Sequence, residues 1–260
     1  MNELLNLAWQ DILSFVFVFV RVGIIFALIP FFGAEVVARR ITAIIAFFLS
    51  LVLVPVVPAV EIAMESISVI TLVVLLFHEL LIGLGLGLAI NVIFAGVQIA
   101  GELVGFQMGF AIVNVVDPMT GVDAPVTSNL LYIVAFLLFL SFGGHHMLIK
   151  ALVDSYYIVP VEAGFPDQKY LLAVLSYGAQ MFLIGVKMAA PAIGVLLLLN
   201  IAFALTARAI PQMNVFLMSF PLTIAIGLFF TIVIIRMMPP FMNRAIGDAF
   251  TFVKSAMPLF

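Results

Sequence analysis

Polar and glycine residues gather in one stretch near the middle of the chain, Gly101–Pro125, which reads GELVGFQMGFAIVNVVDPMTGVDAP. The stretch contains carboxylates and amides but no lysine or arginine: Glu102, Gln107, Asn114, Asp117 and Asp123. Long apolar runs flank it on both sides. Polar groups and glycines that interrupt apolar runs often mark function in membrane proteins, so a substrate or ion site here is the first hypothesis.

Other residue types that could do chemistry lack the partners that the chemistry requires. His78 and Glu79 resemble the start of a zinc-protease helix, but that pattern needs a second histidine where Ile82 stands. His145 and His146 are adjacent, so on a helix they point in different directions and chelate poorly. The chain has no cysteine for a thiolate site and no Gly-x-Ser-x-Gly nucleophile turn. We therefore expect no enzyme, no cofactor and no metal site.

Composition indicates a membrane protein. Of the 260 residues, 66% are hydrophobic and 9% are charged, with a mean hydropathy of +1.37. Soluble domains are about half apolar and about a quarter charged. The net charge of −3 and the absence of a basic run argue against nucleic-acid binding. The N-terminus lacks the basic region of a signal peptide, so the first apolar run is expected to remain in the mature protein.

The elements that must position the central stretch are expected to be helices within one membrane domain, residues 1–260. Apolar runs predict spans at 12–32, 41–60 and 215–238, a shorter apolar run at 130–142, and a weakly amphipathic tail at 241–260. Pro55 and Pro58 should end the second span. The runs 67–104 and 170–205 exceed one simple crossing, and the first is either one long tilted helix or two elements that meet. These features predict bent helices and hairpins.

Charged residues constrain the topology only in part. Arg21 lies in the middle of the first span, so it should face protein, water or a headgroup, or else snorkel at a membrane edge. Arg39 and Arg40 are expected in a short charged turn, which the positive-inside rule places in the cytoplasm. If the chain has six spans, the loop that contains Arg208 also lies in the cytoplasm. The charged tail would then lie outside, against the rule. The positive-inside rule therefore supports only part of this topology.

Three glycines of the central stretch recur every four residues: Gly101, Gly105 and Gly109. On a helix they form one smooth stripe that allows another backbone to approach closely. The stretch then continues through Asp117-Pro118, which favours a turn. A glycine stripe that leads into an irregular loop can pack and also move, as a gate or plug must. Tight helix packing alone would produce the same pattern.

A second polar stretch, Ala207–Pro221, reads ARAIPQMNVFLMSFP between two apolar spans. Pro211 holds Ile210 in extended geometry and predicts a sharp connection. The polar side chains of this connection are Arg208, Gln212 and Asn214. Either they form an ordinary hairpin tip or they contact a partner.

Both stretches resemble one known family. The segment ARAIPQMNVFLMSFPL is similar to the signature of the FliR family, flagellar biosynthesis membrane proteins of the type III export gate. The central stretch and the later segment LSFGGHHMLIKALVDSYYIVP resemble the same family in order and spacing, over about 11–248. Injectisome export proteins share the general pattern and remain an alternative. The residues at 116–118 and 211–214 are more similar to those of the flagellar proteins than to those of the injectisome proteins.

The resemblance implies an all-α, multi-helix integral membrane protein with bent hairpins in a hetero-oligomeric export gate. Family members are not enzymes and are expected to assemble with the P-type and Q-type proteins FliP and FliQ. FlhB wraps the cytoplasmic side of that gate, and FlhA supplies an energy-coupling ring. The gate belongs to the flagellar basal body in the bacterial inner membrane and passes unfolded rod, hook and filament subunits. Much of the complex is raised toward the periplasm, which would explain the partial fit of the positive-inside rule.

The resemblance also implies roles for individual residues. The family's pore plug maps onto about 106–122, with plug or gate residues Phe106, Gln107, Met108, Gly109, Phe110, Asp117 and Met119. Apolar members of this set would fill the closed lumen, and methionine suits a seal that must re-form around passing chains. Gly101, Gly105 and Gly109 would provide helix packing and a hinge. Partner contacts are expected at Arg208, Pro211, Gln212 and Asn214.

A secondary transporter is the less favoured alternative. Transporters also contain broken helices and polar groups at mid-depth, but their halves usually match. Gly101–Pro125 has no counterpart near the other long run, and Glu102, Asp117 and Lys187 do not define an ion pathway. The sequence therefore favours an export-gate component.

Overall fold

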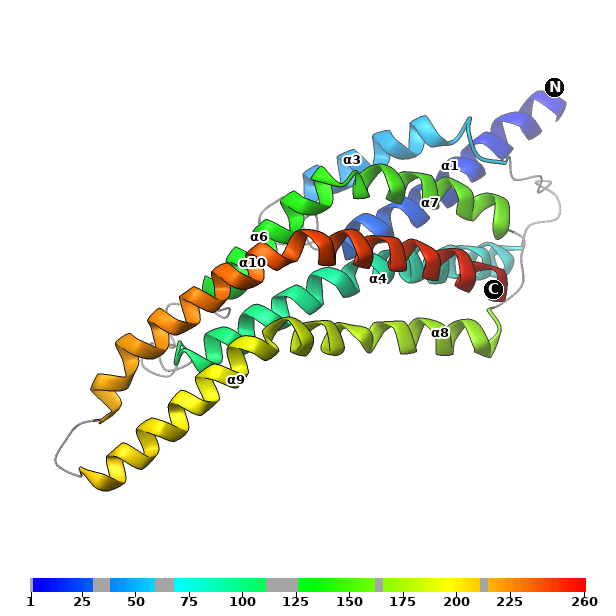
Figure 1. Cartoon of the computed structure of the whole chain (residues 1–260). Helices are drawn as coiled ribbons and strands as arrows, with labels where there is room; N and C mark the ends of the chain where they lie inside the picture. Colours follow the sequence, from blue (N-terminus) through cyan, green and yellow to red (C-terminus); the bar gives the residue numbers. More distant parts are fainter. Residues whose placement is uncertain (1, 30–37, 59–67, 111–125, 162–165, 211–214) are drawn as a thin grey trace. The chain divides into compact units, whose positions relative to one another are not determined.

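The computed structural model describes residues 2–29, 38–58, 68–110, 126–161, 166–210 and 215–260. Within these ranges all regular structure is helical (Figure 1), which confirms the predicted all-α fold. The helices are α1 (Asn2–Leu28), α3 (Arg39–Leu53), α4 (Val69–Gln107), α6 (Val126–Ser141), α7 (Gly144–Ile158), α8 (Gln168–Gly178), α9 (Gln180–Ala209) and α10 (Val215–Ala256). A short 3-10 turn, η2 (Met257–Leu259), follows α10.

The chain forms two compact units. Unit 1 comprises Met1–Val92, Gly143–Gly178 and Ile246–Phe260, and unit 2 comprises Ile93–Phe142 and Ala179–Ala245. Helices α4 and α10 each contribute one part to each unit. This division does not test the prediction of one membrane domain of the family type, which stays a prediction.

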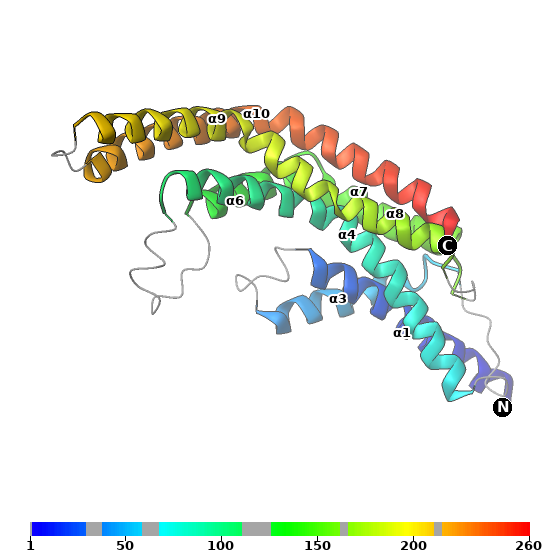
Figure 2. The ribbon, with the colours of Figure 1, turned by 90° about the horizontal axis from the view of Figure 1, so that it is seen from below.

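In unit 1, α3 differs from the predicted second span. It begins at Arg39, so Arg39 and Arg40 form the first turn of a helix and the charged turn expected there is wrong for these two residues. The helix ends at Leu53, shortly before Pro55, because proline removes a backbone donor. Its 15 residues are too few for a crossing, since a membrane-spanning helix needs about 20. Figure 2 shows α3 beside α1, and the Phe47 ring contacts that of Phe15 edge-on at 5.2 Å.

Helix α4 runs unbroken for 39 residues. The apolar run 67–104 therefore contains one very long helix, which is the first of the two predicted alternatives. Its glycines admit close neighbours in unit 1: a Cβ added at Gly87 would lie 2.8 Å from Leu28 Cβ of α1. Such contacts let α1 and α4 pack at short range.

Bends and prolines divide the remaining helices less than the sequence predicts. α6 ends and α7 begins around Gly143, whose φ of +71° favours glycine. α10 continues through Pro221, Pro239 and Pro240, so the tail at 241–260 is not a separate element. Met238 and Met242 on either side of the proline pair are fully buried, and this packing stabilises the continuous helix.

Four helical segments in the described ranges are long and apolar enough to cross a membrane, or five if α6 and α7 form one broken span. The six spans considered from the sequence are not reached there. In unit 2, Figures 1 and 2 show α9 and the first half of α10 side by side as an antiparallel hairpin. Large apolar side chains on this hairpin are exposed, among them Phe182, Leu198, Phe229 and Ile232. These faces suit lipid or other subunits.

Candidate functional site

In unit 2, α4 ends in a glycine turn at the start of the predicted plug. Gly109 has a φ of +87°, which glycine adopts without steric cost. Its N–H donates to the carbonyl of Phe106 at 3.0 Å, and the N–H of Phe110 donates to the carbonyl of Gly105 at 3.1 Å. These two bonds form a Schellman motif, which satisfies carbonyls at the end of a helix and redirects the chain. The last glycine of the stripe therefore ends the helix.

The first glycine of the stripe lies against the beginning of α6. A Cβ added at Gly101 would lie 2.8 Å from the backbone nitrogen of Ser128. The Thr127 hydroxyl donates to the carbonyl of Gly101 at 2.8 Å, and the Ser128 hydroxyl donates to the carbonyl of Gln98 at 3.1 Å. Close backbone approach and two interhelical hydrogen bonds thus hold the start of α6 on α4. The last turns of α4 and the start of α6 are consequently held together within unit 2.

The predicted plug residues have different environments. Phe106 is 67% exposed, whereas Met108 is 1% exposed and contacts Gly227 of α10. Gln107 and Phe110 are half-buried, and the Gln107 side-chain oxygen accepts a bond from Asn200 at 3.4 Å. Asp117 and Met119 lie outside the described residues. Met108 therefore packs inside unit 2 in this structure, while Phe106 projects outward.

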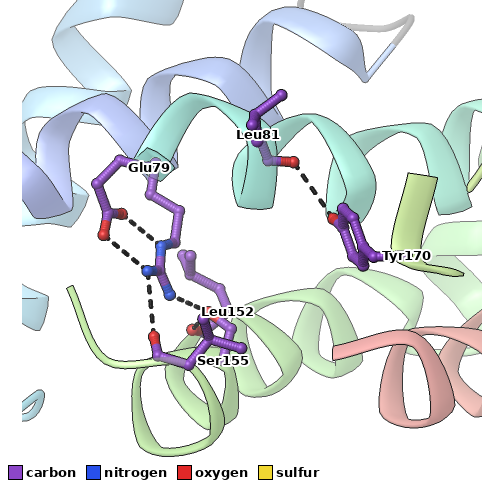
Figure 3. Close-up of polar contacts among 7 residues, drawn as sticks. Glu79, Leu81, Leu152, Ser155 and Tyr170 are labelled. Atoms are coloured by element: carbon purple, nitrogen blue, oxygen red, sulfur yellow. Dashed lines mark hydrogen bonds and ion pairs between the residues drawn. The ribbon is translucent and has the colours of Figure 1, made fainter. Parts of the chain in front are cut away.

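Unit 1 contains a polar cluster whose pairing the sequence analysis missed. Arg21 of α1 and Glu79 of α4 are both fully buried. Arg21 Nε and Nη2 donate to the two Glu79 carboxylate oxygens at 2.6 and 2.8 Å. Arg21 Nη1 donates to Ser155 Oγ of α7 at 2.8 Å, and the guanidinium carbon lies 3.8 Å from the centre of the Tyr156 ring. Figure 3 shows Glu79 and Ser155 with the dashed contacts of this cluster. It also shows a separate bond, from the Tyr170 hydroxyl to the Leu81 carbonyl.

This Arg21 cluster connects α1, α4 and α7. A planar guanidinium matches a carboxylate with two parallel bonds, which compensates part of the cost of burying both charges. Arg21 therefore faces protein, one of the options that its position predicted. The useful signal was the presence of opposite charges in two separate apolar runs, since ionisable groups in such runs usually pair. The contacts of the cluster hold three helices together.

The remaining candidates do not converge on a site. The His78 ring lies edge-on to the Phe260 ring, with centroids 4.5 Å apart, which is an aromatic packing contact. Within the part of the chain that the structure describes, no group of three or more potential ligands could hold a metal ion. Arg208 is exposed in the last turn of α9. The other predicted partner contacts, Pro211, Gln212 and Asn214, lie outside the described residues.

Comparison with known proteins identifies the family. The family described as "Bacterial export proteins, family 1" matches residues 12–249. The flagellar biosynthetic protein FliR of Bacillus subtilis (strain 168) is 36% identical over 226 residues, which cover 85% of each chain. FliR of Pectobacterium carotovorum is 32% identical, covering 91% of this chain and 90% of that protein. FliR of Escherichia coli (strain K12) is 31% identical, covering 92% of each. The chain therefore belongs to the bacterial export proteins of family 1, the family that includes FliR.

Proposed function

We propose that the chain helps to form and plug the channel of the flagellar type III export gate. Its family makes it a component of the flagellar export apparatus, and its apolar helices suit the bacterial inner membrane. Through this channel, unfolded rod, hook and filament subunits would cross the membrane. The chain acts there as a structural gate component, without catalysis and without a cofactor.

The observation that carries this proposal is the attachment of both ends of the segment 111–125. One end leaves α4 through the Gly109 turn, and the other enters α6 beside the bonds from Thr127 and Ser128. Because α4 and α6 are held to each other beside it, the proposed plug could move in and out of a lumen without unravelling these helices. This arrangement supports a plug over about 106–122, with Phe106, Phe110 and Met119 in the lumen and Gln107 and Asp117 beside it.

Met108 receives a different role from the other plug residues. Its side chain is buried in unit 2 and packs against Gly227 of α10. We therefore assign Met108 to the attachment of the plug. The packing of Gly101 against Ser128 supports a helix-packing role for the glycine stripe.

The proposed partners are FliP, FliQ, FlhB and FlhA. Exposed apolar side chains on the α9–α10 hairpin provide surface for neighbouring membrane subunits. Arg208, exposed at the end of α9, together with Pro211, Gln212 and Asn214, would contact these partners. The contacts would set assembly and leave passage through an assembled gate unaffected.

Deletion of residues 109–118 tests the plug. In cells with an assembled complex, we expect the deletion to raise ion leakage, because the seal is lost. A variant in which glycine and serine replace the same ten positions separates the loss of the sealing side chains from the shortening of the loop. Unchanged leakage in the deletion variant, at normal complex levels, would contradict the plug assignment.

Alanine substitution of Arg208, Gln212 and Asn214 tests the partner contacts. After co-expression with the P-type and Q-type proteins, native mass measurement should find less assembled complex, while export per assembled complex is retained. Lys187→Ala, which changes another exposed cation in unit 2, serves as the control. Full assembly of the triple variant would contradict the assignment, and a chain that purifies alone would favour a transporter.

A further inference from the structure

We propose that Met108 and Gly227 form a latch that positions the start of the plug and holds it closed. This inference rests on the proposed plug function. The latch joins the end of α4 to α10 within unit 2. Met108 is buried and would act through the segment that follows it.

The contact involves almost the whole Met108 side chain. Around the position of a Cβ added at Gly227 lie Met108 Cγ, which is closest, Sδ at 2.5 Å and Cε at 3.1 Å. The thioether therefore crosses the space that any side chain at 227 would need. Because Cγ is the nearest atom, moving the methyl tip alone would not clear this space. A methyl group at 227 must rotate Met108 about its first torsion or displace the end of α4.

A second contact on the same helix holds the next residue. A Cβ added at Gly109 would lie 3.1 Å from the Phe220 ring. Phe220 and Gly227 are seven residues apart on α10, which is about two helical turns and places them on one face. Thr231 donates its hydroxyl to the Gly227 carbonyl at 2.9 Å, within the same helix. One face of α10 thus contacts Met108 and Gly109 in succession.

These two residues decide where the plug segment begins. Met108 directly precedes Gly109, whose positive φ and Schellman bonds redirect the chain out of α4. A displacement of Met108 from Gly227 therefore changes the direction of the segment at its origin. The other end is different, because Thr127 and Ser128 hold it to α4 by hydrogen bonds.

The chemistry of the latch suits reversible release. Methionine is flexible and adapts to irregular surfaces, and glycine provides a recess without a polar group that must be satisfied. Separation of Met108 from Gly227 leaves no buried charge behind. Movement of α10 away from the end of α4 would then free the plug while the α6 side stays attached.

Gly227→Ala in the full chain, assembled with its partner subunits, tests the latch. The methyl group overpacks the closed arrangement, so we expect the closed-to-open ratio to fall by about tenfold, the size expected for modest overpacking. Ion leakage per assembled complex should rise accordingly. Gly96→Ala is the matched control, because its Cβ would lie 2.7 Å from Ile184 Cβ in the same unit but away from the plug. That control should lower the amount of complex without raising leakage per complex.

Met108→Ala, alone and combined with Gly227→Ala, completes the test. If both residues act through one contact, the double variant leaks no more than the leakier single variant. If the double variant instead shows the product of the two single increases in leakage, the latch is wrong. If Gly227→Ala does not assemble, Met108→Ala decides the question, since it removes the contact without adding bulk, and normal leakage would overturn the latch.

The deletion of residues 109–118 separates the two proposals. If that deletion leaks while assembled Gly227→Ala and Met108→Ala do not, the plug stands and the latch is wrong. If the deletion itself does not leak, the plug function fails and the latch fails with it.

Discussion

Helix α4 is held in different ways in its two parts. In unit 1, its first part is attached to α1 and α7 by the fully buried pair of Arg21 and Glu79. In unit 2, its second part is held largely by glycines: Gly96 against α9 and Gly101 against α6. Met108 at the end of α4 lies against Gly227 of α10. Close packing at glycines therefore occurs in both parts of α4, and among the described residues the buried charge pair is added in the first part.

The difference bears on where the molecule can move. Separating Arg21 from Glu79 would leave unpaired charges in a dry interior, so this attachment strongly resists opening. Separating two apolar surfaces at a glycine leaves no such charge. The part of α4 that leads into the proposed plug therefore has the attachment that opens more readily, and the Arg21 cluster provides a fixed base within unit 1.

The largest expected effect is at the charged attachment. Glu79→Gln leaves Arg21 without its counter-charge, and breaking a buried pair in this way costs about 3 to 5 kcal/mol. Thermal unfolding of the purified complex should show a large loss of stability. The double variant Arg21→Met with Glu79→Met should recover much of it, because no unpaired charge remains. A Glu79→Gln variant as stable as the double variant would contradict this role.

Gly101→Ala should have the next largest effect. The added methyl meets the Ser128 backbone, which cannot rotate away as a side chain can. We expect a loss of about 1 to 3 kcal/mol, the range for overpacking, measured by thermal unfolding of the complex. If Gly101→Ala leaves the thermal stability of the complex unchanged, α4 and α6 can move apart at this position without a loss of stability.

Thr127→Val should have a smaller effect. It removes the buried bond to the Gly101 carbonyl, at a cost of about 1 kcal/mol. Hydrogen exchange should then be faster in the first turn of α6. Thr251→Val is the comparison, because that exposed hydroxyl bonds only within its own helix, to the Gly247 carbonyl. Equal effects of the two substitutions would argue against an attachment role for Thr127.

Gly194→Ala should have the smallest effect and the opposite sign. A Cβ added there meets no atom within 4 Å in the described structure. Alanine favours a helix over glycine by about 1 kcal/mol, so the stability of the complex should stay the same or rise slightly. A marked loss of assembly would show that this face of α9 packs closely against another subunit.

Local patterns predicted much of the fold. The apolar runs predicted an all-α membrane protein, and Pro55 predicted the interruption where α3 ends. The spacing of Gly101 and Gly109 drew attention to the end of α4. These predictions succeed because helix periodicity, proline and glycine act over a few residues.

Other features depend on the neighbours that a helix acquires. The continuation of α10 through Pro239 and Pro240 contradicts the local signal, because buried residues on both sides stabilise the helix. The environment of Met108 also depends on another helix, since the recess beneath it belongs to Gly227. The residues near Met108 in the sequence carry no information on how close Gly227 lies to it.

The sequence by itself determined the membrane character, the helical class, the family resemblance and the glycine stripe, all of which follow from residue type and short-range spacing. Only the tertiary structure decided that Arg21 pairs with Glu79, 58 residues away, and that Met108 packs against Gly227. The physical reason is that a buried charge or a bulky side chain is satisfied by whichever helix lies beside it, and that helix is set by packing.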